Sequence, residues 1–213
     1  MDERSDGLII RTRPLTETSL VAHWLTPELG RIATVAKGAR RAKSKFRGRL
    51  DLMQQAKFSF RRSRRSELHT LTEIEQLRRH DSMRKDVTSL RLMAYATRLV
   101  EQTTEPENPL LGTYVIFTTL LEHLATARTR PALVYALEMK LLNELGLSPA
   151  LSESKLDDST INLLEQLAVR NWNEINSMKP NKSQVKAMKE YLHGFLIYHL
   201  GKLPLGREAL LAG

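Results

Sequence analysis

Seven lysine and arginine side chains lie within thirteen residues of this chain, from Lys37 to Arg49, with no carboxylate among them. Such cations bind phosphate groups, and each nucleic-acid phosphate that they contact releases a condensed counterion and adds affinity. We therefore predict that two basic runs bind a nucleic-acid backbone. They comprise Lys37, Arg40, Arg41, Lys43, Lys45, Arg47 and Arg49, and then Arg61, Arg62, Arg64 and Arg65. Phe46, inside the first run, is the aromatic candidate for stacking on an unpaired base.

A solvated basic loop would show the same composition. The first run, however, lies between strand-like segments rather than in a tail, and it contains no proline and only two glycines, Gly38 and Gly48. The charge is also concentrated in one part of the chain. Residues 1–80 hold 18 Lys and Arg against 9 Asp and Glu, whereas residues 81–213 hold 15 of each. This asymmetry favours a basic binding module joined to a neutral body.

Candidates for catalysis or metal binding are few. Glu73 and Glu75 would share one face of a strand, and paired carboxylates can hold Mg²⁺ in a nuclease, but no third acid lies at a helpful spacing. The six histidines are scattered, no cysteine is present, and no phosphate-loop, dinucleotide or hydrolase motif occurs. We therefore expect no catalytic residue, no metal and no cofactor, and we do not expect an enzyme.

The elements that would position the basic runs are strands. Five short segments rich in Ile, Leu, Val and Thr are separated by turn residues. The predicted strands are Gly7–Arg13, Ser19–Thr26, Arg31–Ala36, Leu50–Phe60 and Leu68–Ile74. A small closed barrel, either an OB-fold or an SH3-like barrel, accommodates five strands with two cationic connections. Trp24, Phe58 and Phe60 are expected in its core rather than against bases.

From residue 81 the apolar residues recur with a helical period. Asn108 and Pro109 predict the start of a helix over Leu110–Ala127, Pro131 opens the next helix, and Asp158 can cap Ile161–Val169. Asn181 and Gln184 form a predicted capping box, and Gly201 and Pro204 end that last long helix. The fold class is therefore α+β, with a basic barrel at residues 1–80 and an all-helical bundle at residues 81–213.

Several segments, in order, resemble the RecO family of bacterial recombination mediators. They are Gly7-Leu-Ile-Ile-Arg-Thr-Arg-Pro14, Thr18-Ser-Leu-Val21, Leu25-Thr-Pro-Glu-Leu-Gly-Arg31, Val35-Ala-Lys-Gly-Ala-Arg-Arg41, Ser66-Glu-Leu-His-Thr-Leu-Thr-Glu73 and Leu141-Leu-Asn-Glu-Leu-Gly-Leu-Ser-Pro149. The resemblance covers roughly residues 7–150 and is most specific up to residue 75. It implies an N-terminal OB-fold and a helical C-terminal domain.

The resemblance also implies a function in DNA repair and recombination. Proteins of this family bind single- and double-stranded DNA, anneal complementary strands, engage the acidic tail of single-stranded DNA-binding protein (SSB), and with RecR help to load RecA. Many members carry a four-cysteine zinc module after the segment that matches Leu147–Pro149. This chain has no cysteine there and resembles a member without the module.

An acidic tail that ends in apolar residues requires an apolar pocket rimmed by cations. We expect that pocket where the helix over 110–127 meets the next helix. Its predicted residues are Phe117, Leu121, Leu124, Arg128 and Arg130, although the three apolar side chains could instead fill the core of the bundle. The N-terminus has no signal-like apolar stretch, which indicates the cytoplasm. An RNA-binding barrel and a nuclease that uses Glu73 and Glu75 remain the alternatives.

Overall fold

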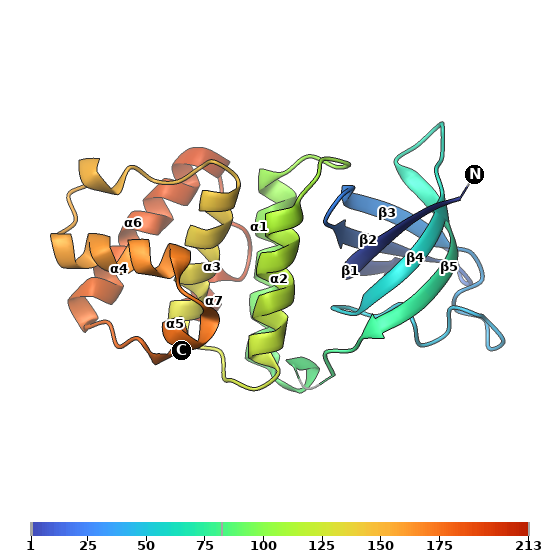
Figure 1. Cartoon of the computed structure of the whole chain (residues 1–213), viewed down its shortest axis with the longest axis horizontal. Helices are drawn as coiled ribbons and strands as arrows, with labels where there is room; N and C mark the ends of the chain where they lie inside the picture. Colours follow the sequence, from blue (N-terminus) through green and yellow to red (C-terminus); the bar gives the residue numbers. More distant parts are fainter. Residues whose placement is uncertain (1, 82, 213) are drawn as a thin grey trace. The chain divides into compact units, whose positions relative to one another are not determined.

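The computed structural model describes residues 2–81 and 83–212, and it contains strands followed by helices (Figure 1). The strands are β1 (Glu3–Pro14), β2 (Leu20–Thr26), β3 (Gly30–Ala36), β4 (Gln55–Arg61) and β5 (Leu68–Arg78). The helices are α1 (Val87–Thr103), α2 (Leu111–Leu124), α3 (Pro131–Glu144), α4 (Asp158–Val169), α5 (Trp172–Ser177), α6 (Lys182–Leu200) and α7 (Arg207–Leu211). The predicted α+β class is confirmed. Among the described residues, no helix combines the length and apolar composition that crossing a membrane requires.

The five strands form a closed barrel in the order β1-β2-β3-β5-β4. β1 pairs in antiparallel fashion with both β2 and β4, so it is bonded along both of its edges. The barrel closes through a short parallel pairing of β3 with β5, from Ala33 opposite Leu68 to Val35 opposite Thr70. This strand order is that of an OB-fold, which decides between the two barrels that the strand count allows.

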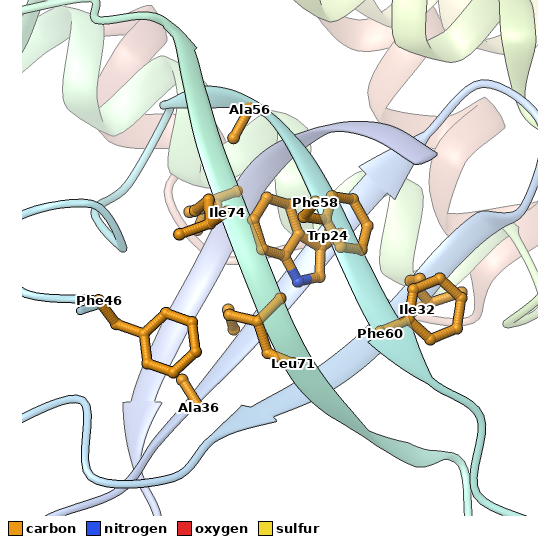
Figure 2. Close-up of a cluster of buried hydrophobic side chains, with 11 residues drawn as sticks. Trp24, Ile32, Ala36, Phe46, Ala56, Phe58, Phe60, Leu71 and Ile74 are labelled. Carbon is orange, nitrogen blue, oxygen red and sulfur yellow. The ribbon is translucent and has the colours of Figure 1, made fainter. Parts of the chain in front are cut away.

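The interior of the barrel is aromatic. Along β4, Ala56, Phe58 and Phe60 point inward and are buried, while Lys57 and Arg61 on the other face are exposed, as the two-residue period of a strand requires. The rings of Trp24 and Phe58 stack with their centroids 4.0 Å apart (Figure 2), and the Trp24 indole N–H donates to the Thr34 hydroxyl at 2.8 Å. The prediction that Trp24, Phe58 and Phe60 belong to the core is therefore confirmed.

The connection between α1 and α2 docks on the barrel. The Arg31 guanidinium donates to the Thr104 hydroxyl at 2.8 Å, and the Leu110 amide donates to the Pro27 carbonyl at 3.1 Å. Gly30 has a φ of +62°, and a Cβ atom at that position would lie 1.8 Å from the Asn108 carbonyl oxygen. Only glycine permits so close an approach.

Contacts divide the chain into two compact units, which differ from the predicted division at residue 80. A barrel unit contains residues 2–81 and 104–121, and a helical unit contains residues 83–103 and 122–212. Most of α2 is therefore grouped with the barrel, because the preceding connection is bonded to β3 and to the turn before it. The boundary at residue 80 stays a prediction.

In the helical unit, α3 is the central element and contacts α1, α4, α5, α6 and α7. Its side chains are buried around most of the helix, which is typical of a helix inside a core. One buried side chain is charged: Glu138 pairs with Arg207 of α7, with Nε 2.7 Å from Oε1 and Nη2 2.9 Å from Oε2. The Tyr95 hydroxyl of α1 donates to the same carboxylate at 2.6 Å, so this group joins three helices.

The helix ends test several sequence predictions. The capping box of Asn181 and Gln184 and the left-handed stop at Gly201 are confirmed. The cap predicted at Asp158 is wrong by one residue, because the Asp157 side chain accepts from the Thr160 amide. α2 begins at Leu111, later than predicted, since the backbone before it is used in docking on the barrel.

Candidate nucleic-acid interface

The basic segment, residues 37–54 between β3 and β4, is a series of turns rather than a free loop. The Arg40 amide donates to the Thr18 carbonyl at 3.0 Å near its start. At its end the Met53 amide donates to the Ile9 carbonyl at 2.7 Å. The predicted strand over Leu50–Phe60 is therefore too long at its start, since β4 begins only at Gln55.

Phe46 anchors the middle of the basic segment. Its side chain is only 5% exposed and belongs to the core cluster that contains Ala36, Leu71 and Ile74 (Figure 2). The sequence predicts this ring as a platform for a base, but the structure places it inside the barrel, where its burial holds the flanking cations on the surface. The ring is therefore not free to stack on a base. Lys45 Nζ lies 5.3 Å from its centroid.

The seven predicted cations of the basic segment are all exposed. Three of them donate to backbone carbonyl groups: Arg40 to Thr16, Arg47 to Ala42 and Arg49 to Ile74, at 3.1–3.3 Å. Arg4, Arg61 and Arg62 of the barrel unit form ion pairs with carboxylates. The basic segment therefore presents concentrated positive charge on the surface of the barrel unit.

The second predicted patch divides into two pairs. Arg61 bonds to Asp2 at 3.2 Å, and Arg62 bonds to both Glu3 and Glu107. The hydrogen bonds that Arg62 donates to Glu3 raise the pKa of Arg62 above its ordinary value. Arg64 and Arg65, by contrast, are exposed at the tip of the turn. The structure thus leaves the latter pair open to phosphate and engages the former pair with carboxylates.

A buried histidine holds this arginine turn in place. The Ser63 amide donates to Nδ1 of His69 at 3.3 Å, so the proton of the neutral ring is on Nε2, which lies 3.0 Å from the Glu107 carboxylate. Glu107 has a φ of +57°, a conformation uncommon outside glycine. Its backbone amide donates to the Arg31 carbonyl. The base of the turn is therefore held by hydrogen bonds, and its position depends on the docked connection.

Other polar residues beside the basic segment carry no sequence signal of their own. Thr16 and Thr18, from the connection between β1 and β2, line a pocket of about 420 Å³ together with Lys37 and Arg41. Lys57 and Arg4 lie beside Lys45 and Arg49 at a second pocket. Isolated threonines and single cations on strands are too common for sequence reasoning to single out.

The carboxylate pair of the nuclease alternative lies among cations. Glu73 pairs with Arg4 at 3.6 Å, and Glu75 is opposite Lys57 in the β4–β5 register. Within the described part of the chain, no three His, Cys, Asp or Glu side chains are grouped so that they could hold a metal ion. The arrangement suits ion pairing better than metal binding.

The predicted tail pocket does not form an open surface. Phe117 and Leu121, grouped with the barrel unit, are 0% exposed, and Leu124 of the helical unit is 4% exposed. All three fill cores, so they are not available as the apolar wall of a pocket. Arg128 and Arg130 are exposed, as the prediction requires.

Arg130 instead lines a different pocket, of about 370 Å³, inside the helical unit. His123 lies in its wall, 6% exposed, with Nδ1 2.8 Å from the Asn173 side-chain oxygen. The His123 Nε2 and the Asn176 Oδ1 are buried and have no hydrogen-bond partner within the described residues. Lys179 also lines the pocket. The cations Arg130 and Lys179 make this site suitable for an anionic group, whereas the Asn176 oxygen can only accept a hydrogen bond.

Two family models match successive parts of the chain. Residues 1–79 match the family model described as "Recombination protein O N terminal", and residues 84–154 match "Recombination protein O C terminal". The chain is similar to the DNA repair protein RecO of Listeria monocytogenes (27% identity over 158 residues, 74% of this chain and 61% of that protein). It is also similar to that of Symbiobacterium thermophilum (30% identity over 149 residues, 69% of this chain and 58% of that protein). The chain thus spans less than two thirds of the length of these relatives.

Proposed function

Because the chain belongs to the RecO family of DNA repair proteins, we propose that it binds single- and double-stranded DNA and anneals complementary strands during repair and recombination. The basic segment is the observation that carries this proposal. It presents seven exposed cations on a closed barrel. In this proposal the protein acts in the cytoplasm, without catalysis and without a cofactor.

Annealing requires two strands of like charge to approach each other. Cations that neutralise backbone phosphates remove part of that repulsion, and phosphate contacts carry no sequence information, so any pair of strands is accepted. Because Phe46 anchors the segment, the cations are held on the barrel surface and need little further ordering when they bind. Bases that contact only solvent then remain free to pair.

The salt dependence of binding tests this proposal. If about five phosphates are neutralised on a single strand, log K falls with log salt at a slope of about −3.5. Substituting Arg40, Arg41, Lys43 and Lys45 by Ala should weaken binding to all sequences alike and reduce the slope by about 0.7 for each lost contact. The matched control removes four exposed cations of the helical unit: Lys155, Arg170, Lys182 and Lys202. An unchanged slope in the first variant, or equal flattening in the control, would refute the assignment.

We also propose that the helical unit receives the acidic tail of SSB, and that the protein works with RecR to help load RecA. The pocket of His123, Arg130 and Lys179 supports this assignment, because its cations suit a carboxylate. A tail peptide should bind the Arg130→Ala, Lys179→Ala variant at least tenfold more weakly than the wild type. Arg128→Ala is the control, since Arg128 does not line this pocket. Equal affinities in all three proteins would place the tail elsewhere.

One assay separates this function from its rivals. Complementary strands are coated with SSB, incubated with the protein and Mg²⁺, and followed for duplex formation and for cleavage. Annealing without cleavage is the expected result. An RNA-binding factor would leave the coated strands single, and a nuclease that uses Glu73 and Glu75 would shorten them.

A further inference from the structure

A pocket of about 360 Å³ lies between the basic segment and the outer face of β4 and β5. Four cations line it: Lys45 and Arg49 from the basic segment, Lys57 from β4 and Arg4 from β1. Phe46, Phe58 and Ile74 also line the pocket, although each is only 2–7% exposed. The volume is in the range of pockets that hold small ligands. The site is therefore a pocket with a cationic rim beside the proposed path of DNA.

Two carboxylates also line this pocket, and they are the unexpected part of it. Glu73 is opposite Ser59 and Glu75 is opposite Lys57 in the strand register, so both point from the same face of β5. The Ser59 hydroxyl donates to Glu73 Oε2 at 3.4 Å, and Arg4 lies 3.6 Å from the same oxygen. The Glu73 side chain remains 66% exposed, so these contacts orient the carboxylate without covering it.

Carboxylates repel phosphates, so a surface that served only the DNA backbone would gain nothing from them. They do accept hydrogen bonds from the exocyclic amine of a base, and cytosine N4 is the group that Glu and Asp recognise in this way. Thymine presents a carbonyl oxygen at the corresponding position, which a carboxylate repels. The bases of a single strand are unpaired, so such an amine is available to the pocket.

We propose that this pocket holds one unpaired base that carries an exocyclic amine, with the amine on Glu73 or Glu75 and the neighbouring phosphates on Lys45, Arg49 and Lys57. The inference rests on the proposed binding of single-stranded DNA and adds a base preference to it. Strands whose bases carry an amine should bind more tightly than thymine strands of the same length.

The test compares oligonucleotides of thymidine with oligonucleotides of 5-methyldeoxycytidine, about 12 nucleotides long, a length within the range of one OB-fold. The two bases share their methyl group and ring size and differ in the amine at position 4 and the proton at N3. The wild type should bind the methylcytosine strand about fivefold more tightly, the low end of the discrimination that one base contact provides. Fluorescence anisotropy at fixed salt measures both affinities.

Glu73→Gln, Glu75→Gln should reduce this preference to less than about twofold, whereas Glu28→Gln should retain it. Glu28 is an exposed glutamate of the barrel unit outside the pocket, so its substitution controls for the general gain in DNA affinity when a negative charge is removed. Equal, salt-dependent binding of both strands by the wild type would overturn the base pocket and leave the proposed DNA binding intact. A preference that persists in the double variant would also overturn it. Failure to bind either strand would overturn the proposed function itself, and the pocket with it.

Discussion

Removing the guanidinium of Arg207 would leave the carboxylate of Glu138 buried without its counter-charge. The Arg207 side chain is 1% exposed and that of Glu138 is 0% exposed. Burial alone would lower the pKa of Arg207, but its bonds to Glu138 raise that pKa above its ordinary value. We predict that Arg207→Met destabilises the helical unit by about 3–5 kcal/mol, the usual cost of breaking a buried ion pair from one side.

Urea unfolding, followed by the helical circular dichroism signal, measures this loss. A slope of about 2 kcal/mol per molar urea converts the predicted loss into a midpoint lowered by about 1.5–2.5 M. The predicted loss is a large share of the roughly 5–15 kcal/mol that stabilises a typical protein. Partial unfolding of the helical unit near room temperature is therefore a further expected sign.

A compensating variant distinguishes the buried charge from lost packing. Arg207→Met with Glu138→Met and Tyr95→Phe removes the carboxylate and the hydroxyl that bonds to it, so no unpaired polar group remains at this position. Buried ion pairs replaced by apolar residues of similar volume often lose no stability, so at least half of the loss should be recovered. The reasoning is refuted if Arg207→Met costs less than about 1 kcal/mol, or if the compensated variant is as unstable as the single one.

Three further predictions concern single positions. Gly30→Ala should destabilise the barrel unit by more than 2 kcal/mol, because its Cβ would meet the Asn108 carbonyl, whereas Gly48→Ala, with a similar φ and open space around it, should cost only about 1–2 kcal/mol in thermal melts. Phe46→Leu should keep DNA affinity within about twofold in anisotropy titrations, since an anchor needs only apolar volume; a larger loss would mean that the ring stacks on bases. Hydrogen bonds from Ser159 and Thr160 lower the pKa of Asp157 to about 2, below its value of about 3.9 in the unfolded chain. Asp157 therefore stabilises the fold above pH 4, and this contribution is lost as the pH falls toward 2. An Asp157→Ala variant should be less stable than the wild type at pH 6, and a stability difference that is equally large at pH 2 would contradict the prediction.

The order of barrel and helices could be predicted because each element carries a local pattern. Apolar residues alternate with polar ones over the short segments that form strands, and they recur every three or four residues over the longer segments that form helices. The Asn181 capping box marks a helix start. α5 is a helix that the sequence analysis missed, yet Asn171 and Glu174 form the same capping signature before it. A helix this short has too few turns for its apolar period to be recognised, so only the cap could have identified it.

The burial and the partners of individual site residues could not be predicted, because they depend on contacts between segments that are distant in the sequence. Phe46 lies in a strongly polar run, and nothing local indicates that its ring enters the core. The carboxylate partners of Arg62 come from residues 3 and 107, which only the folded barrel brings together. Likewise, the apolar period of α2 predicts that Phe117 lies on the apolar face of the helix, but it does not indicate which part of the chain covers that face.

The docked connection between α1 and α2 affects the order in which the chain can fold during synthesis. β5 ends at Arg78, but the barrel unit also contains residues 104–121, which are made only after all of α1. α1 in turn belongs to the helical unit, most of which is made later still. The N-terminal part of a chain usually folds first as it emerges from the ribosome. Here residues 104–121 of the barrel unit are made only after residues 83–103 of the helical unit. Until then, the emerging strands lack the contacts that this segment provides.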